Sequence, residues 1–386
     1  MHDVVLLFIV VITALAFDFT NGFHDTANAM ATSIATGALR PKTAVALSAV
    51  LNLLGAFLSI KVAATIASGI VSSTAITLPI VFAGLLGAIA WNVLTWSFGL
   101  PSSSSHALIG GVIGATLVSA GMSAVHGHSI VAKVIVPAVL SPIIAGVVAG
   151  LATRLAYRSA RPAERPAAHR YFRYGQLASA SLVSLAHGTN DAQKTMGVIT
   201  LALIADHRLA AHADPPAWVI VACALAIAAG TYFGGWRVIR TMGHKLTHIE
   251  PPQGFAAQTA AATVLLTATQ GGLPLSTTHI TSGAVLGSGV GKREAHVRWG
   301  VAGSMVIAWL LTLPAAALMA AGLGWIIGDG GRVQVIVVAV VAAALLGAAW
   351  LWSRRHPITA DNVNEFPEPA DRAIRDRERP VLEQAV

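Results

Sequence analysis

The sequence contains little charge, since only 11% of its 386 residues are Asp, Glu, Lys or Arg. Soluble domains are about one quarter charged, so this scarcity argues against a soluble enzyme. Hydrophobic residues make up 55% of the chain, and its mean hydropathy is +0.69. Apolar runs of roughly 15 to 25 residues fill most of it, close to the length that crosses a hydrocarbon core. The sequence therefore predicts an all-α, polytopic membrane protein.

Cysteine is almost absent, and the single Cys223 excludes an internal disulfide. The net charge of +8 raises the question of nucleic acid binding. However, the basic residues lie between apolar runs rather than on one face, which is typical of loop charges that fix membrane topology. We expect no nucleic-acid partner. We also expect no cleavable signal, because residues 1–3 carry no positive charge.

Two motifs occur twice in the chain, in the same order. GFHDTANAM at 22–30 matches GTNDAQKTM at 188–196, and LPSSSSH at 100–106 matches LPLSTTH at 273–279. Recurrence of both motifs is not expected by chance, so the chain is an internal duplication. We divide it into a first transmembrane repeat, a basic cytoplasmic linker, a second repeat, an additional transmembrane helix and a charged flexible tail. These segments are residues 1–156, 157–174, 175–325, 326–352 and 353–386.

The distribution of positive charge predicts the orientation. If each repeat crosses the membrane an odd number of times, the second copy is inverted. Placing the N-terminus outside and the C-terminus inside puts 16 of the 25 Lys and Arg residues on the inside and four in outside loops. We therefore predict a multi-pass protein of the cytoplasmic (inner) membrane. The Ser-rich segments can instead form re-entrant helical hairpins, so the number of full spans stays open.

Three acidic residues lie inside apolar segments: Asp18, Asp25 and Asp191. A charge at the bilayer centre costs at least about 2.5 kcal/mol and usually marks function. Asp18 fits a structural role equally well. Asp25 and Asp191 occupy equivalent positions in the two repeats, next to glycine and asparagine, which are poor helix formers. We expect broken helices near residues 21–25 and 188–191, as in many transporter sites.

The spacing within the first motif predicts a coupling site. Asp25 and Asn28 are three residues apart and share one helical face, where a carboxylate and an amide oxygen suit a small hard cation or a proton. In the second copy, Asn190 precedes Asp191, and Lys194 takes the place of Asn28. Because lysine can neutralise the aspartate, this half-site needs no bound cation. A plain buried ion pair is the alternative.

The second motif predicts an anion site. Proline followed by Ser or Thr indicates a helix start, where free N–H groups and the helix dipole attract anions. Phosphate can also donate a hydrogen bond to a carboxylate, whereas sulfate cannot and leaves the acid unpaired. The two aspartates therefore favour phosphate over sulfate. The predicted substrate-binding residues are Asp25, Ser103, Ser104, Ser105, Asp191, Ser276, Thr277 and Thr278.

Four histidines lie in or beside the motifs: His24, His106, His187 and His279. They are candidates for a proton relay, for metal ligation or for hydrogen-bonded helix caps. They show no tight metal-ligand spacing, so we predict no structural metal site.

The segments that carry the motifs resemble the PiT family of inorganic phosphate transporters, specifically its bacterial low-affinity Pit type. They are GFHDTANAMAT at 22–32, WNVLTWSFGLPSSSSHALIG at 91–110, AHGTNDAQKTMGVI at 186–199 and GLPLSTTHITSG at 272–283. The resemblance implies a homodimer with inverted repeats and phosphate near the membrane centre. Sodium-coupled members typically have Asn where this chain has Lys194. Bacterial members resembling this chain use protons and can carry neutral metal–phosphate complexes.

The hypothesis from sequence is secondary active phosphate uptake across a lipid membrane, driven by protons, with Asp25 as the leading proton acceptor and no bound cofactor. Sodium coupling is the less favoured alternative, and a divalent metal is a candidate co-substrate. A sulfate or metal carrier and a phosphate sensor remain open. A membrane enzyme using Ser104 with His106 or His279 is also open, although no Gly-x-Ser-x-Gly elbow is present.

Overall fold

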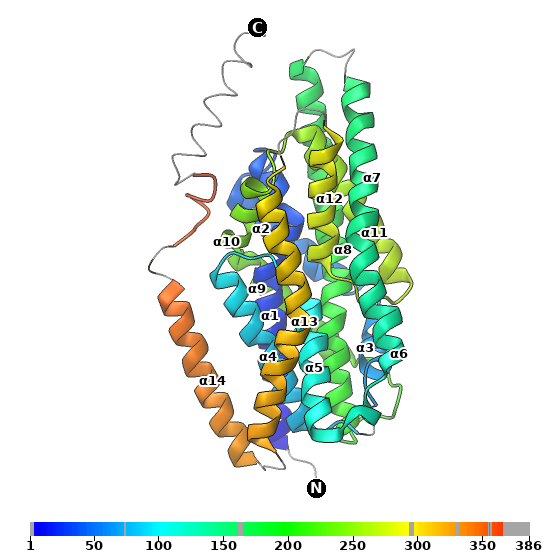
Figure 1. The fold of residues 1–386 in the computed structure, drawn as a ribbon, viewed down its shortest axis with the longest axis vertical. Helices are drawn as coiled ribbons and strands as arrows, with labels where there is room; N and C mark the ends of the chain where they lie inside the picture. The colour runs from blue at the N-terminus through cyan, green and yellow to red at the C-terminus, as the bar shows by residue number, and fades with distance from the viewer. Residues whose placement is uncertain are drawn as a thin grey trace.

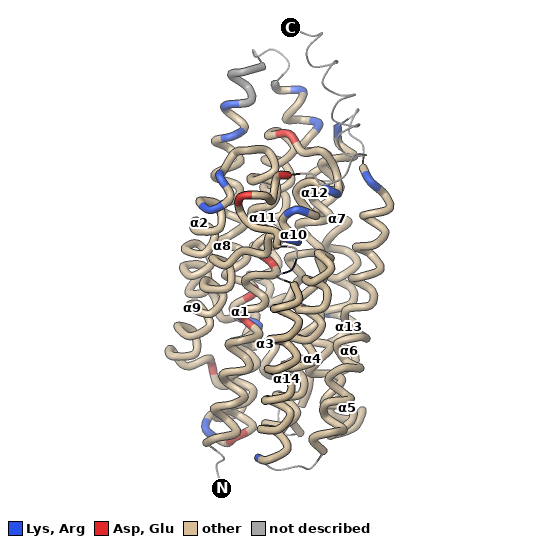
Figure 2. Tube along the Cα trace, turned by 90° about the vertical axis from the view of Figure 1, so that its left-hand side faces the viewer, with Lys and Arg blue, Asp and Glu red and all other residues tan. Residues whose placement is uncertain are grey.

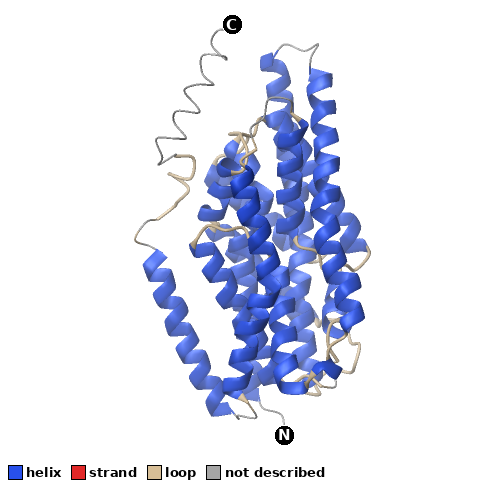
Figure 3. Cartoon of the chain, in the orientation of Figure 1, coloured by secondary structure: helices blue, strands red, loops and turns tan. Residues whose placement is uncertain are grey.

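The computed structural model describes residues 4–72, 75–160, 165–292, 297–328, 332–353, 355 and 357–365. Within these ranges the chain is helical, with two isolated β-bridges and no strand (Figure 3). The helices are α1 (Val4–Ala35), α2 (Pro41–Gly55), α3 (Lys61–Gly69), α4 (Leu78–Ser97), α5 (Ser104–Ala120), η1 (Met122–Ala124), α6 (Gly127–Ile130), η2 (Val131–Ile135), α7 (Val136–Ala160), α8 (Arg165–Ala205), α9 (Ala217–Phe233), α10 (Trp236–Arg240), η3 (Thr241–Lys245), α11 (Pro251–Gln270), α12 (Thr277–Gly291), α13 (Trp299–Ile327) and α14 (Arg332–Ser353).

The helices form an elongated bundle, and α14 lies at its side (Figure 1). Five helical segments of the described part are long and apolar enough to cross a membrane, and a sixth span results if the bent pair α9 and α10–η3 counts as one. Figure 2 shows charged residues gathered toward the ends and few between them. The predicted all-α, multi-pass architecture is confirmed.

Equivalent helices of the two repeats exchange partners. Helix α1 packs against α9, and its counterpart α8 packs against α2. Asn21 on α1 donates to Asp191 on α8, whereas Thr36, directly after the end of α1, donates to Gln176, earlier on α8. Residues with higher numbers on one helix therefore contact residues with lower numbers on the other, so α1 and α8 run antiparallel.

The predicted breaks in the first helix of each repeat are wrong. Helix α1 is continuous through residues 21–25, and α8 is continuous through residues 188–191. The glycines allow close packing instead. A Cβ atom on Gly22 would lie 2.3 Å from the carbonyl oxygen of Ile227, and one on Gly188 would lie 2.2 Å from that of Asn52. Small residues of this kind let membrane helices approach closely, which explains these glycines without a break.

The structure adds detail to two other segments, the predicted linker and the predicted tail. The segment 157–174, expected to be a linker, continues α7 to Ala160 and begins α8 at Arg165, and residues 161–164 lie outside the described part. The tail was expected to be flexible from residue 353. Instead, Arg240 and His244 hydrogen-bond to Asn362 and Asn364, and Val363 is fully buried. These contacts dock residues 357–365 on the bundle, while residues 366–386 lie outside the described part.

Two apolar cores lie along the bundle with a polar layer between them. Residues of α1 from Leu6 to Phe17 belong to one core, and residues from Ala27 to Ile34 belong to the other. Helix α8 contributes to both cores in the same way, on either side of residues 187–191. The middle of α1 and the middle of α8 therefore place their polar side chains in one buried layer.

Candidate functional site in the buried polar layer

Two helical hairpins bring the Ser/Thr segments to the polar layer. Helix α4 turns into α5 through residues 98–103, and α11 turns into α12 through residues 271–276. Ser103 and Ser276 are the N-caps, and each side chain accepts a hydrogen bond of 3.2 Å from the backbone N–H three residues later. The sequence duplication thus folds into the same local structure twice, and each cap satisfies one of the free N–H groups of the first helical turn.

Asp25 is surrounded by hydrogen-bond donors. Its Oδ1 lies 2.6 Å from His24 Nδ1, and it accepts bonds of 3.3 Å from Ser104 and 3.4 Å from Thr278. Thr277 Oγ1 lies 3.2 Å from its Oδ2. The carboxylate is 1% exposed, yet it contacts donors from three helices. This environment satisfies an ionised carboxylate.

Asp191 is satisfied mainly by a single cation. Lys194 Nζ lies 2.7 Å from Asp191 Oδ1, and it also donates to Ser105 Oγ and to the carbonyl of Leu275. Both partners of the ion pair are buried. The predicted pairing of Lys194 with Asp191 is therefore present, and the lysine also joins α8 to both hairpins.

Thr277 links the two half-sites. Its hydroxyl lies 3.2 Å from Asp25 and 3.4 Å from Asp191, so a single hydroxyl group can donate to either carboxylate. Asn28 donates to Thr277 and Thr278, and its own side-chain oxygen, Oδ1, has no partner. Asn190 points elsewhere, to Thr269 and the carbonyl of Leu273. Of the two amides predicted for coupling, only Asn28 bonds to hydroxyls that contact a carboxylate.

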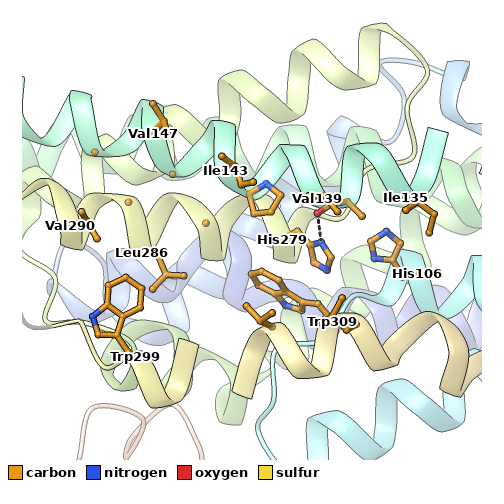
Figure 4. Close-up of a pocket in the computed structure, with 18 of the residues that line it drawn as sticks. His106, Ile135, Val139, Ile143, Val147, His279, Leu286, Val290, Trp299 and Trp309 are labelled. Carbon is orange, nitrogen blue, oxygen red and sulfur yellow. Dashed lines mark hydrogen bonds between the residues drawn. The ribbon is translucent and has the colours of Figure 1, made fainter. Parts of the chain in front are cut away.

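The four histidines divide into two pairs. His24 contacts Asp25, and His187 Nε2 lies 3.4 Å from Asp191 Oδ2 without hydrogen-bond geometry. The rings of His106 and His279 lie 4.8 Å apart, and Figure 4 shows both at an apolar groove lined by α7, α12 and α13. There, His279 donates to the carbonyl of Ala138. A relay through all four histidines is not a continuous hydrogen-bonded chain in this structure.

Three groups converge as cation ligands would. One ligand atom from each of Asp25, His187 and Asp191 lies within 4.8 Å of the others. Sequence spacing did not reveal this group, because its members come from two helices that meet only in the tertiary structure. Sequence analysis also missed Asn21, which donates to Asp191, and Asn52, which contacts His187 and Thr231. Single amides within apolar runs were the available signal.

The charges in the layer do not balance. Asp18, Asp25 and Asp191 carry three negative charges when ionised, and Lys194 supplies one positive charge. With neutral histidines, this group is net negative. Such a layer can bind an anion only together with a further positive charge.

Ser104 donates to Asp25 and to no histidine, so the arrangement expected of a serine nucleophile is not formed there.

The fold and this layer define a multi-pass membrane protein with its polar site inside the helical bundle. Comparison with known proteins then gives the family. The model of the phosphate transporter family matches residues 21–320, so the chain belongs to that family.

Similar proteins are also named as phosphate transporters. A "Probable low-affinity inorganic phosphate transporter" of Mycobacterium bovis is 58% identical over 361 residues, which cover 93% of this chain and 87% of the relative. A protein of the same name from Rhizobium meliloti is 46% identical, covering 82% and 95%. The solved structure of "The sodium-dependent phosphate transporter" has the same fold, with a TM-score of 0.75 at 24% identity, covering 84% of this chain and 99% of that one.

Proposed function

We propose that this protein imports inorganic phosphate by secondary active transport coupled to protons, and that it is not an enzyme. The observation that carries the proposal is the meeting of two helix starts and two carboxylates in one buried layer. The helix starts suit an anion, and the carboxylates suit an anion that carries protons. Phosphate near neutral pH has both properties, whereas sulfate has no proton to donate.

Phosphate binding would rearrange hydrogen bonds that are already present. The hydroxyls of Ser104, Thr277 and Thr278 donate to Asp25 in this structure. Phosphate oxygens would accept these bonds instead, and a phosphate hydroxyl would donate to the carboxylate. Lys194 would add a charge-assisted contact. The exchange keeps these hydroxyls and the Asp25 carboxylate paired, as burial in a dry layer requires.

Coupling to a positive ion follows from the charge of the layer. Phosphate adds at least one negative charge to a group that is already net negative, and that charge is costly at low dielectric. A proton or a cation must therefore enter with it. Lys194 already occupies one oxygen of Asp191, so the second half-site does not need a sodium ion, and this favours a proton as the coupling ion.

Alternating access would use the two repeats. We propose that they are related by inverted symmetry, because α1 and α8 run antiparallel and exchange partners. Rocking of one repeat against the other would open the polar layer to each side in turn. We also propose a homodimer in the inner membrane, with lipid on the outer helices, the N-terminus outside and the C-terminus inside. The basic ends of α7 and α8 support this orientation.

A second candidate is co-transport of a divalent metal with phosphate. The converging ligand atoms of Asp25, His187 and Asp191 favour it. A neutral metal–phosphate complex would solve the charge problem without a proton. Uptake that stops when the external metal is chelated would support this candidate over the proton mechanism.

The test is uptake of radiolabelled phosphate by the purified protein in liposomes with imposed gradients. We expect an inward proton gradient to drive accumulation without sodium, and unlabelled sulfate not to compete. Uptake that follows sodium and ignores pH would contradict proton coupling. The variant Lys194→Asn is the matched probe, because it restores the amide found in the first repeat, and we expect it to acquire sodium dependence.

A further inference from the structure

We propose that Asp18 binds the coupling proton, at a site separate from the phosphate-binding carboxylates. The inference rests on the proposed proton-coupled transport and names the residue where that proton is held. Asp18 lies on α1, seven residues before Asp25, about 10 Å along the helix. Its side chain is fully buried.

The three buried acids of the layer differ in their donors. Asp25 contacts His24 and three hydroxyls, and Asp191 contacts Lys194 and Asn21. Neither Asp18 oxygen has a hydrogen-bond partner. A buried carboxylate without donors strongly disfavours its ionised form, so the proton is best held where donors are fewest. By this criterion the proton belongs on Asp18 and not on Asp25, the acceptor favoured by sequence.

The surroundings of Asp18 contain polar atoms that can serve a protonated carboxyl. Thr195 on α8 faces Asp18. Neither the Thr195 hydroxyl nor the side-chain oxygen of Asn21 has a hydrogen-bond partner. The charged or titratable groups that face Asp18 are Asp191 and Lys194 on α8 and the Cys223 thiol on α9. These atoms offer few of the oxygen ligands that a sodium ion needs, and the Lys194 ammonium opposes a metal cation.

The position of Asp18 also links its proton to the phosphate site. Toward the N-terminus of α1, the buried side chains are the apolar Leu6, Leu7, Val10, Ala14 and Phe17. Toward the site, Asn21 lies one turn away and donates to Asp191. A proton therefore reaches or leaves Asp18 through the polar layer, where phosphate binds. Movement of the proton would require that layer to open, which is the condition for coupling.

The experiment compares two kinds of transport by Asp18→Asn in liposomes. Exchange of labelled for unlabelled phosphate needs no net proton movement, so we expect it to continue at a rate comparable to that of the wild type. Accumulation driven by a pH gradient needs proton binding, and each pH unit supports about a tenfold ratio per coupled proton. We expect this accumulation to be lost in Asp18→Asn and restored in Asp18→Glu. Asp214→Asn, an exposed loop acid, is the control and should behave as wild type.

The outcomes separate the two proposals. If wild-type uptake ignores the pH gradient, proton-coupled transport itself fails. If the wild type responds and Asp18→Asn accumulates phosphate equally well, the role of Asp18 is overturned while the proposed function stands. A response to sodium that disappears in Asp18→Asn would also overturn it, in favour of a cation site.

An infrared measurement covers the case in which Asp18→Asn does not fold. We expect the wild type without phosphate to show the C=O stretch of a protonated carboxyl, sensitive to deuterium exchange. Asp18→Glu should shift this band because its carboxyl sits on a longer side chain. A wild-type spectrum with no protonated carboxyl band, or a band unmoved by Asp18→Glu, would overturn the assignment.

Discussion

The two half-sites have the same sequence origin and similar backbones, but they satisfy their aspartates differently. Asp25 is held by neutral donors from α5 and α12, with Asn28 behind them. Asp191 is held by the ammonium group of Lys194. The comparison indicates that a lysine within the second copy supplies the positive charge that a bound ion would otherwise provide. The first half-site is therefore free to respond to the charge and protons of a ligand.

The largest expected effect comes from removing the positive charge of Lys194. In Lys194→Met, Asp191 becomes a buried charge without its main partner, and breaking such a pair costs about 3–5 kcal/mol. We expect the free energy of unfolding, measured by denaturant titration in detergent micelles, to fall by this amount. Phosphate uptake should also be lost.

The double variant Asp191→Asn with Lys194→Met is the matched control. It removes both charges, so we expect stability to recover to within about 1 kcal/mol of the wild type. Full stability of the single variant Lys194→Met would contradict the view that the lysine is required to neutralise Asp191.

The second-largest effect tests the first half-site, in which neutral groups donate hydrogen bonds to Asp25. Asp25→Asn keeps a side chain that accepts hydrogen bonds but removes the charge, and hydrogen bonds to a charged group contribute about 1.5–3 kcal/mol. We expect the apparent affinity for phosphate to fall by about 10- to 150-fold. Unlike Lys194→Met, this variant leaves no charge unpaired, so its thermal stability should change little. Unchanged affinity in concentration-dependent uptake would remove Asp25 from the phosphate site.

A smaller effect tests whether the two copies are packed alike. Gly22→Ala and Gly188→Ala each place a Cβ atom within 2.3 Å of a carbonyl oxygen on the neighbouring helix. Overpacking of this kind costs about 1–3 kcal/mol, and we expect similar losses in thermal unfolding for both variants. Gly300→Ala, at a position with no atom within 4 Å, is the control. A large loss of thermal stability in only one of the two variants would show that the two copies are not packed alike.

The smallest effect contrasts the buried ion pair with one near the surface. Glu250, before α11, lies 2.7 Å from Lys292 and also accepts a hydrogen bond from Tyr157. Burial raises the pKa of Glu250, but the hydrogen bonds from Lys292 and Tyr157 and the Lys292 charge outweigh it, so its pKa lies below the ordinary value. Its stabilisation is therefore present above the pKa of the unfolded carboxyl and is lost as pH falls through the lower folded pKa.

Glu250→Gln should weaken this acid-induced loss of stability. Because both partners are partly exposed, we expect an effect of no more than about 1 kcal/mol, reduced further by salt. Unfolding measured against pH in the variant and the wild type checks the direction. Identical pH profiles would exclude a contribution from Glu250.

Much of the geometry of the polar layer was predictable from sequence, because its motifs are duplicated. The pairing of Asp191 with Lys194 was predictable, since residues three apart share a helical face. The helix starts at Ser104 and Thr277 were predictable from proline and hydroxyl residues. The breaks near Asp25 and Asp191 were predicted wrongly, because glycine signals both flexibility and close packing, and only the neighbouring helix distinguishes them. The separation of His106 and His279 from the carboxylates had no local signal.

By itself, the sequence determined a multi-pass helical protein of duplicated origin, because hydropathy and repeated motifs are local properties that each segment carries independently. Only the tertiary structure decided which polar groups share protons and charge. Asp18 lacks donors, Asp25 gathers hydroxyls and His187 approaches both motif aspartates because helices far apart in the chain cross at those residues. The electrostatics of a buried group depend on its neighbours in space, and the chain order does not list them.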